Sequence, residues 1–237
     1  MDNVDFLEIN APVGYERRLV VFFDVLGWKS QVDQAGSDPE RLTRLALLPR
    51  LLTHSIVGAM SAKGERKMTS FSDCAVVSTP FDDGDIVRVL QGLCSVVAGA
   101  AVNGFFLRAG VTVGDLCHDN RMVFGPGLNR AHHLESTGKY PRIVLDDEID
   151  SFRSLRIDGL CEEDGVLFVD AYLLSNFENA IRSSMYPSPI DAHFLYEQVI
   201  LLVRKELDQA QSSSVREKFE WLHSRMCAHY AVAKGRR

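Results

Sequence analysis

Apolar residues recur along the chain with two spacings, one typical of strands and one typical of helices. Residues 18–26 read RLVVFFDVL, a nearly continuous apolar run that predicts a buried strand. Short apolar runs predict further strands at 67–71, 75–78, 105–113, 121–124, 142–145 and 166–169. Apolar residues three or four positions apart predict helices at 39–60, 85–102, 128–137 and 194–207.

Turn and capping residues complete this pattern. The stretch GDLCHDN at 114–120 has turn composition, so the strands on either side of it are expected to form a hairpin. Pro49 is expected to kink the first long helix. Ser214-x-x-Glu217 is a capping box and predicts the start of a last helix.

The order of these elements predicts an α+β fold. Helices that alternate with paired strands favour an antiparallel or mixed sheet with helices on one face, compatible with a ferredoxin-like core. We expect a polar N-terminal segment at 1–17, helical or irregular, then one main domain at 18–175. A C-terminal helical extension at 176–237 is expected to pack on that domain.

Composition narrows the class of protein. The 237 residues are 46% hydrophobic and 24% charged, which is typical of a globular chain and excludes a disordered one. The net charge of -6 argues against nucleic acid as the main partner. Five scattered cysteines without a CxxC pair indicate neither a zinc site nor a disulfide framework, so we expect reduced thiols in a cytoplasmic protein.

No membrane contact is expected either. The acidic start MDNVDFLEIN lacks the apolar core of a signal peptide. The longest apolar stretch, 86–102, is short for a bilayer span and is interrupted by polar residues.

Two aspartates lie in an unusual context. Asp24 falls within the apolar strand, and Asp73 lies between two short apolar strands. A carboxylate buried in such a strand is costly unless it is paired or holds a metal. Adjacent strands are about 4.8 Å apart, so the two carboxylates can meet and suit Mg²⁺ or Mn²⁺. The alternative is that each aspartate is a cap or turn residue.

A glycine-rich turn precedes a helix at residues 125–135, which read GPGLNRAHHLE. The free N–H groups at a helix N-terminus favour phosphate, and the first turns carry Asn129 and Arg130. The alternative is that Gly-Pro is simply a turn.

Together these motifs resemble the catalytic domain of class III nucleotidyl cyclases. The resemblance rests on the F-x-D-x-x-G-[FW] pattern at 22–28, Asp73 in a hairpin, the strand LRAGVTVG at 107–114, and G-x-x-x-N-x-A-x-x-L-E at 125–135. The strand YPRIVL at 140–145 follows in the family's order. The match covers roughly residues 18–175.

This resemblance implies a two-metal enzyme that works as a head-to-tail homodimer with shared active sites. Asp24 and Asp73 would bind two divalent ions, Mn²⁺ or Mg²⁺, with the Val25 backbone carbonyl completing one site. Asn129 would orient the ribose and the transition state. Thr69 and Met122 stand at the base-reading positions, and Phe23 and Arg130 are further expected substrate contacts.

The chain departs from the purine-specific pattern. Adenylyl cyclases have a base-reading Lys where Thr69 stands, and an Asp or Thr where Met122 stands, so ATP is not the expected substrate. His133 takes the place of the family's transition-state Arg, and it is either a catalytic group or a helix-surface residue. Arg130 and Arg108 are candidate replacement cations, and Arg108 is equally an internal ion-pair partner for the sheet. The late hairpin at 162–166 has no match to the family's phosphate-binding Lys.

The closest pattern is that of the bacterial pyrimidine cyclases of anti-phage defence, the Pycsar systems. The resemblance implies conversion of UTP to 3′,5′-cyclic UMP and pyrophosphate, with the product activating a separate effector. Three alternatives stay open: a cytidylate cyclase, a purine cyclase with unusual base contacts, and a degenerate domain that only binds nucleotide or dimerises.

Overall fold

A mixed β-sheet forms the centre of the protein. The computed structural model describes residues 14–59, 65–119, 121–182 and 191–235. The strand order is β2-β3-β1-β4-β6-β8-β7, and β5 pairs with β4 outside this path. Strands β4 and β6 run parallel, and the other neighbours are antiparallel. The bounds are β1 Glu16–Val25, β2 Lys67–Phe71, β3 Cys74–Pro80, β4 Leu107–His118, β5 Val123–Phe124, β6 Ile143–Leu145, β7 Leu160–Glu163 and β8 Val166–Val169.

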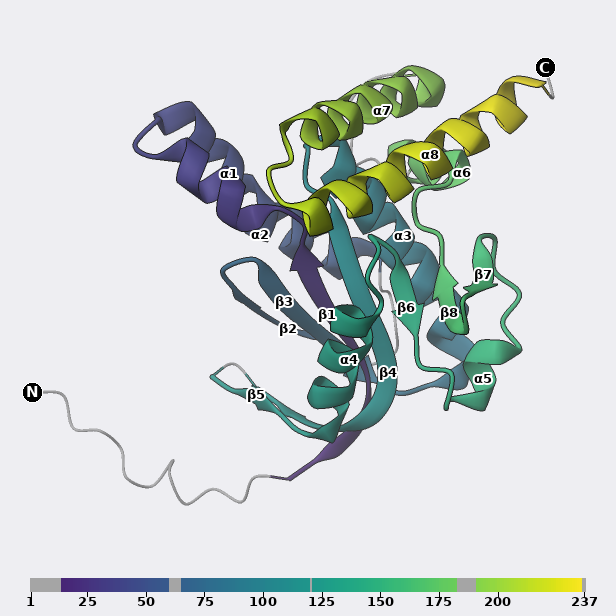
Figure 1. Cartoon of the computed structure of the whole chain (residues 1–237). Coiled ribbons are helices and arrows are strands. Elements are labelled where there is room, and N and C mark those ends of the chain that lie inside the picture. The colour runs from purple at the N-terminus through teal and green to yellow at the C-terminus, as the bar shows by residue number, and fades with distance from the viewer. Residues whose placement is uncertain (1–13, 60–64, 120, 183–190, 236–237) are drawn as a thin grey trace, which may run out of the picture.

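Helices cover both faces of this sheet (Figure 1). Helices α2 and α3 lie behind it, α4 lies in front of it, and α8 crosses one end. The bounds are α1 Trp28–Ala35, α2 Pro39–Ala59, α3 Ile86–Val102, α4 Pro126–Thr137, α5 Asp150–Arg153, α6 Leu174–Ala180, α7 Ala192–Gln209 and α8 Ser213–Gly235. A short 3₁₀ turn, Asp83–Asp85, precedes α3.

Alternation along β1 divides the interior into two unequal cores. Leu19, Val21 and Phe23 face the large core, which also contains the buried residues of α2 and α3. Val20 faces the opposite side and packs with Ala131 of α4 in a small core. The face beneath α4 is therefore only partly covered, and we call it the open face of the sheet.

Helix α4 lies against β4 with almost no space between the two backbones. A Cβ placed on Gly110 would come within 2.1 Å of the Ala131 carbonyl oxygen. Only glycine is compatible with such a close approach. The glycine in the strand pattern at 107–114 is thus explained by packing, and it fixes α4 over the open face.

The expected cyclase-core fold is confirmed, with differences in detail. Strand β4 extends to His118, so residues 114–118 of the expected turn are strand, and the hairpin turns after Asp119. Glu16 and Arg17 belong to β1 rather than to the N-terminal segment, whose residues 1–13 lie outside the described residues. Helix α4 lies on the face opposite α2 and α3, so the helices do not keep to one face. The pattern did not predict α1, α5, α6 or β7.

The C-terminal helices share the large core. Phe219, Leu222 and Met226 of α8 are buried in it, and the ring of Phe219 packs edge to face on Phe106, with centroids 5.4 Å apart. Glu217 pairs with Lys139 at 2.5 Å instead of closing a capping box. One stretch of the described chain, Asp83–Val102, is long and apolar enough to cross a membrane, but 67% of it is buried, as in a core helix.

Candidate functional site

The polar residues of interest share the open face of the sheet. Strand register places Asp24 opposite Cys74 on one side and opposite Arg108 on the other. Because side chains opposite each other in a sheet point to the same face, these three groups converge. The same register places Arg18, Ser78, Thr69 and His118 on this face, towards the other end of β1.

Asp24, Asp73 and Cys74 form a compact group of possible metal ligands. One ligand atom from each lies within 4.8 Å of the others. The Cys74 Sγ is 4.0 Å from Asp24 Oδ1 and 3.9 Å from Asp73 Oδ1, so both carboxylates turn an oxygen towards the same point. Ser72, with φ of 54°, makes the tight turn that returns Asp73 to this point. Two converging carboxylates fit a divalent ion of the Mg²⁺ or Mn²⁺ type.

The Cys74 thiol is not a ready ligand by itself. Burial, followed by the nearby charges of Asp73 and Asp24, raises its pKa to about 12. Only a thiolate is a strong metal ligand, so the neutral thiol leaves the two carboxylates as the effective donors.

Arg108 holds Asp24 from the side opposite the ligand cluster. Its Nε donates to Asp24 Oδ2 at 3.1 Å, and its Nη2 forms a second, shorter contact with the same oxygen. Asp24 Oδ1 faces Cys74, so one carboxylate oxygen is fixed by arginine and the other is turned to the cluster. Arg108 is thus an internal ion-pair partner, one of the two roles that the sequence left open.

Glu135 and Lys218 complete the charged cluster. Arg108 Nη2 is 2.6 Å from Glu135 Oε1, a charge contact without hydrogen-bond alignment. Burial raises the Glu135 pKa to about 7, although Arg108 opposes the shift. Lys218 of α8 interacts electrostatically with Asp24, Glu135 and Arg108, and burial lowers its pKa. The C-terminal helix therefore adds a positive charge beside the two metal-binding candidates.

We expect Glu135→Gln to change the pH dependence of stability. The folded pKa of about 7 lies above the ordinary value of 4.5 for a glutamate, so the folded protein keeps a proton that the unfolded chain loses in this window. Stability contributed by this group is present below pH 4.5 and is lost as pH rises towards 7. The variant should therefore gain about 3 kcal/mol relative to wild type between about pH 4 and about pH 8. Urea denaturation at both pH values measures this, and an equal effect of the substitution at both would contradict it.

Helix α4 presents the other residues that the motif singled out. Asn129 and His133 are one helical turn apart and exposed on the same side of α4. Arg130 instead turns to Asp146, with Nη2 and Oδ1 2.6 Å apart, and to Glu148 at 3.0 Å. Arg130 is thus part of an ion-pair cluster, and its predicted contact with substrate stays a prediction.

Thr69 and Met122 come together near the β4–β5 turn. Thr69 Oγ1 lies 3.1 Å from His118 Nε2, at the end of β4. Met122, 40% exposed, follows in the same turn, whose Asp119 side chain accepts from the Met122 N–H at 2.8 Å. The two positions expected to read the base therefore lie at one corner of the open face.

Two expected contacts are placed differently. The Phe23 side chain is fully buried in the large core, on the face away from Asp24, so it cannot reach a substrate. The expectation that this side chain binds substrate is wrong, because alternation along β1 turns it inward. Val25 is also buried, and the predicted role of its backbone carbonyl stays a prediction.

The two groups of residues lie at different places on the open face of the sheet. Asn129 and Glu135 are separated by six residues of α4, or about 9 Å along its axis. Strand β2, which holds Thr69, ends at Phe71, and the chain reverses at Ser72 before it reaches Asp73. The carboxylate cluster is at one end of the open face, and the base-reading corner is towards the other.

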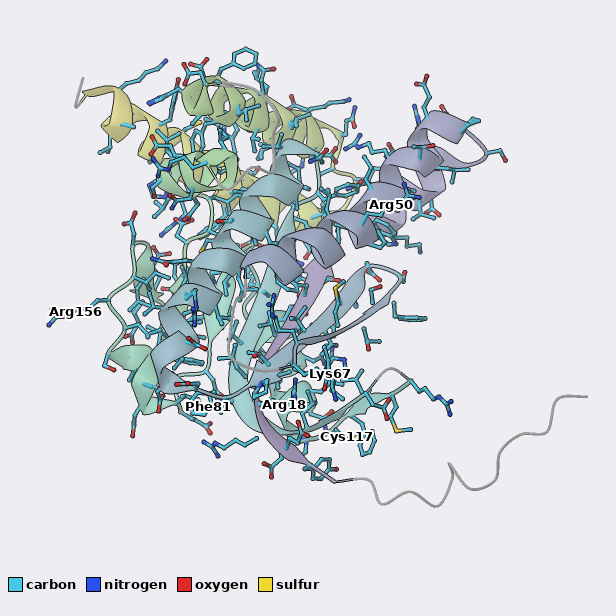
Figure 2. The ribbon with its side chains drawn as sticks, turned by 180° about the vertical axis from the view of Figure 1, so that it is seen from behind. Arg18, Arg50, Lys67, Phe81, Cys117 and Arg156 are labelled. Atoms are coloured by element: carbon cyan, nitrogen blue, oxygen red, sulfur yellow. The ribbon has the colours of Figure 1, made fainter. Side chains whose placement is uncertain are left out.

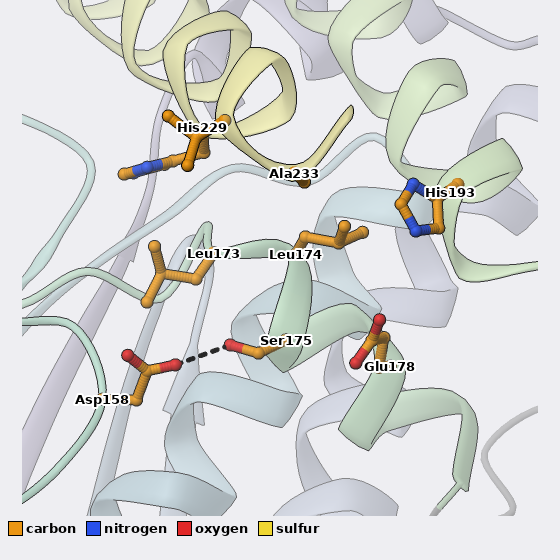
Figure 3. Close-up of a pocket in the computed structure, with 9 residues that line it drawn as sticks. Asp158, Leu173, Leu174, Ser175, Glu178, His193, His229 and Ala233 are labelled. Carbon is orange, nitrogen blue, oxygen red and sulfur yellow. Dashed lines mark hydrogen bonds between the residues drawn. The ribbon is translucent and has the colours of Figure 1, made fainter. Parts of the chain in front are cut away.

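The described cavities lie elsewhere. One of about 430 Å³ is lined by Asp158, which precedes β7, and by residues of α6, α7 and α8, among them Glu178, His193 and His229 (Figure 3). In that view, His193 and His229 stand at opposite sides, and Asp158 accepts a hydrogen bond from Ser175. A second, of about 630 Å³, lies along α8 near Tyr140 and Trp221. Neither includes Asp24 or Asp73, and the Asp24 side chain is 15% exposed.

Sequence reasoning missed several members of the site. Glu135 stands in the quoted motif and Cys74 adjoins Asp73, so both had a local signal that was not used. His118 was placed in a turn, which hid its position on a strand. Lys218 lies about 190 residues from Asp24 on an extension with no motif, so nothing in the sequence indicated its position.

Comparison with known proteins supports the fold. No family model matches the sequence, and no curated protein matches it. A bacterial light-regulated adenylyl cyclase structure is similar, with a TM-score of 0.50 and 14% identity over 81% of this chain and 98% of that chain. The chain has the fold of a class III cyclase catalytic core.

Other solved structures are less similar. A second structure of a bacterial light-regulated adenylyl cyclase has a TM-score of 0.47 and 11% identity over 81% of this chain. This chain covers only 58% of that one. The catalytic core of a rhodopsin-guanylyl cyclase with converted specificity, in complex with ATPalphaS, has a TM-score of 0.47 and 14% identity, over 65% of this chain and 93% of that chain.

Proposed function

We propose that the protein is a pyrimidine nucleotide cyclase that converts UTP to 3′,5′-cyclic UMP and pyrophosphate. The observation that carries the proposal is the convergence of Asp24 and Asp73 on the open face of a cyclase-core fold. Both carboxylates turn an oxygen towards one point beside a neutral thiol, which supports a shared metal ligand set.

The donor set fits divalent ions of the Mn²⁺ or Mg²⁺ type. Asp24 and Asp73 would hold them, and when bound they would activate the ribose 3′-hydroxyl and neutralise the leaving pyrophosphate. Arg108 fixes the orientation of Asp24 through Oδ2 and leaves Oδ1 for coordination. Glu135, in turn, balances the charge of Arg108 from beneath α4. Lys218 adds positive charge where the triphosphate would lie.

A second copy of the chain would complete the site. The main support is the resemblance to class III cyclases, which implies that one subunit supplies the metal carboxylates and the other supplies the base-reading residues and the asparagine. Exposed apolar side chains lie along the open face and its edge, including Phe71 at 79% and Phe124 at 41% exposed. A head-to-tail homodimer would cover them and bring Asn129 of the partner subunit to the carboxylates of the first.

The wider role rests on resemblance to the Pycsar cyclases. In this proposal a cytoplasmic enzyme makes the cyclic nucleotide during phage infection, and a separate effector responds to it. Cytidylate cyclase activity is the nearest alternative.

One observation favours a degenerate domain instead. Arg108 already neutralises one oxygen of Asp24, so this carboxylate is paired without a metal ion. An inactive domain can keep this ion pair, whereas in an active enzyme Asp24 must bind its metal while it is paired with Arg108. Nucleotide binding without turnover is the signature of this second candidate.

The test is incubation of the purified protein with each of the four nucleoside triphosphates and Mn²⁺. We expect a phosphatase-resistant cyclic monophosphate and equimolar pyrophosphate from UTP, with less product from CTP and little from ATP or GTP. Chelation of the metal should abolish the reaction. Failure of every triphosphate to yield a cyclic product would overturn the proposal.

A further inference from the structure

A buried hydrogen-bonded chain connects the interior of the open face to Thr69. Arg18 Nε donates to Ser78 Oγ at 2.8 Å, and Ser78 Oγ lies 2.8 Å from His118 Nδ1. His118 Nε2 lies 3.1 Å from Thr69 Oγ1. Arg18, Ser78 and His118 are 1%, 0% and 4% exposed, whereas Thr69 is only half-buried. The chain of contacts therefore starts in the protein interior and ends at the surface.

Four strands supply these residues. Arg18 belongs to β1, Thr69 to β2, Ser78 to β3 and His118 to β4. Figure 2 shows Arg18 close to Lys67 of β2 and to Cys117, the neighbour of His118 on β4. The sheet thus holds the chain of contacts rigidly, with no loop involved.

Arg18 determines which group donates in each hydrogen bond of this chain of contacts. Its guanidinium only donates, so Ser78 Oγ accepts from Arg18. In the described part of the chain, the other partner of the Ser78 hydroxyl is His118 Nδ1. A buried hydroxyl proton without an acceptor is costly, so Ser78 donates to Nδ1.

The imidazole of His118 continues the same order of donors and acceptors. Burial, followed by the charges of Arg18 and Lys67, lowers the His118 pKa to about 4, with Asp119 opposing the shift. The ring is therefore neutral at physiological pH, and its single proton is on Nε2 because Nδ1 accepts. Nε2 then donates to Thr69 Oγ1.

Thr69 is left as a donor. Among the described residues, the hydrogen-bond partner of its hydroxyl is His118, from which it accepts, so the hydroxyl proton points outwards. Met122 contributes an apolar surface at the same corner, without polar groups that compete for a base edge.

We propose that the Arg18–Ser78–His118 relay fixes the Thr69 hydroxyl as a hydrogen-bond donor that selects the 4-oxo group of uracil over the 4-amino group of cytosine. The inference rests on the proposed function, since it assumes that a pyrimidine nucleotide binds at this corner. Uracil presents an acceptor at C4, whereas cytosine presents N–H donors there. A donor facing a donor leaves both unpaired, which binding sites reject strongly.

Binding of non-reactive analogues tests the inference without turnover. Calorimetry with 3′-deoxy-UTP and 3′-deoxy-CTP in the presence of Mn²⁺ should show at least about 10-fold tighter binding of the uracil analogue. Thr69→Val should bring the two affinities within about threefold of each other. The matched control is Ser70→Ala on the same strand, an exposed neighbour that should keep the preference.

The relay itself has a separate readout. Long-range ¹H–¹⁵N spectra of the wild-type protein should show His118 protonated on Nε2 alone. His118→Gln should keep the preference for uracil, because an amide can also accept from Ser78 and donate to Thr69. His118→Leu should lose it.

The outcomes separate the two claims. Equal binding of both analogues, preference for the cytosine analogue, or a proton on Nδ1 would overturn the relay while leaving cyclase activity possible. Selective binding of the uracil analogue without any cyclic product would overturn the proposed function alone. Binding of neither analogue would overturn both.

Discussion

Asp24→Asn and Asp73→Asn should each lower the rate of cyclic nucleotide formation at least about 1,000-fold. The loss of one carboxylate removes a negative ligand from a site that depends on charge to hold divalent ions. Metal stabilisation of a phosphoryl transition state is worth several kcal/mol, and about 1.4 kcal/mol corresponds to a tenfold change in rate. The measurement is the initial rate with UTP and saturating Mn²⁺.

Both variants should remain folded, because each amide keeps the shape of the carboxylate and Arg108 retains Glu135 as a partner. Thermal melting should confirm this. Asp33→Asn on α1 is the matched control, since Asp33 is an exposed aspartate outside the ligand cluster. Activity that survives either Asp24→Asn or Asp73→Asn would show that the cluster is not the metal site.

Mixing two inactive variants should restore activity if the site is shared between subunits. Asp24→Asn removes the metal side of a site, and Asn129→Ala removes the side that we assign to the partner subunit. A heterodimer of the two has one site with both lesions and one intact site. Random exchange should therefore recover about a quarter of the wild-type rate.

A mixture of Asp24→Asn with Asp73→Asn serves as the control for this experiment. Both lesions are on the metal side, so every site in that mixture carries one of them and no recovery is expected. An absence of recovery in the first mixture, with subunit exchange shown by mass, would mean that each chain builds a complete site. That result would contradict the head-to-tail arrangement.

The sequence predicted the scaffold of the site better than its chemistry. Residues 18–26 were identifiable as a strand because apolar residues dominate them, and the short strand at 67–71 was also found. The pairing of Asp24 with Asp73 followed from two carboxylates in similar apolar contexts, and the structure brings them together. Such features are local, so composition and spacing are enough to reveal them.

Features that depend on contacts between distant parts of the chain could not be predicted from the sequence. The Arg108–Glu135 contact depends on the approach of α4 to Gly110, which no spacing in the sequence expresses. Lys218 reaches the cluster only because Phe219 and Leu222 anchor α8 in the large core. Phe23 was misjudged because one position along β1 decides between the open face and the core.

The most direct test of the account is the fate of UTP labelled at the α-phosphate. Purified protein at a concentration equal to that of the labelled UTP, in the presence of Mn²⁺, should give a phosphatase-resistant product. This product should be identical to 3′,5′-cyclic UMP by chromatography and mass. The amount of labelled cyclic UMP should rise in proportion to the amount of pyrophosphate released. Label that stays in UTP, or appears in linear UMP, would contradict the claim that the Asp24–Asp73 cluster serves a nucleotide cyclase.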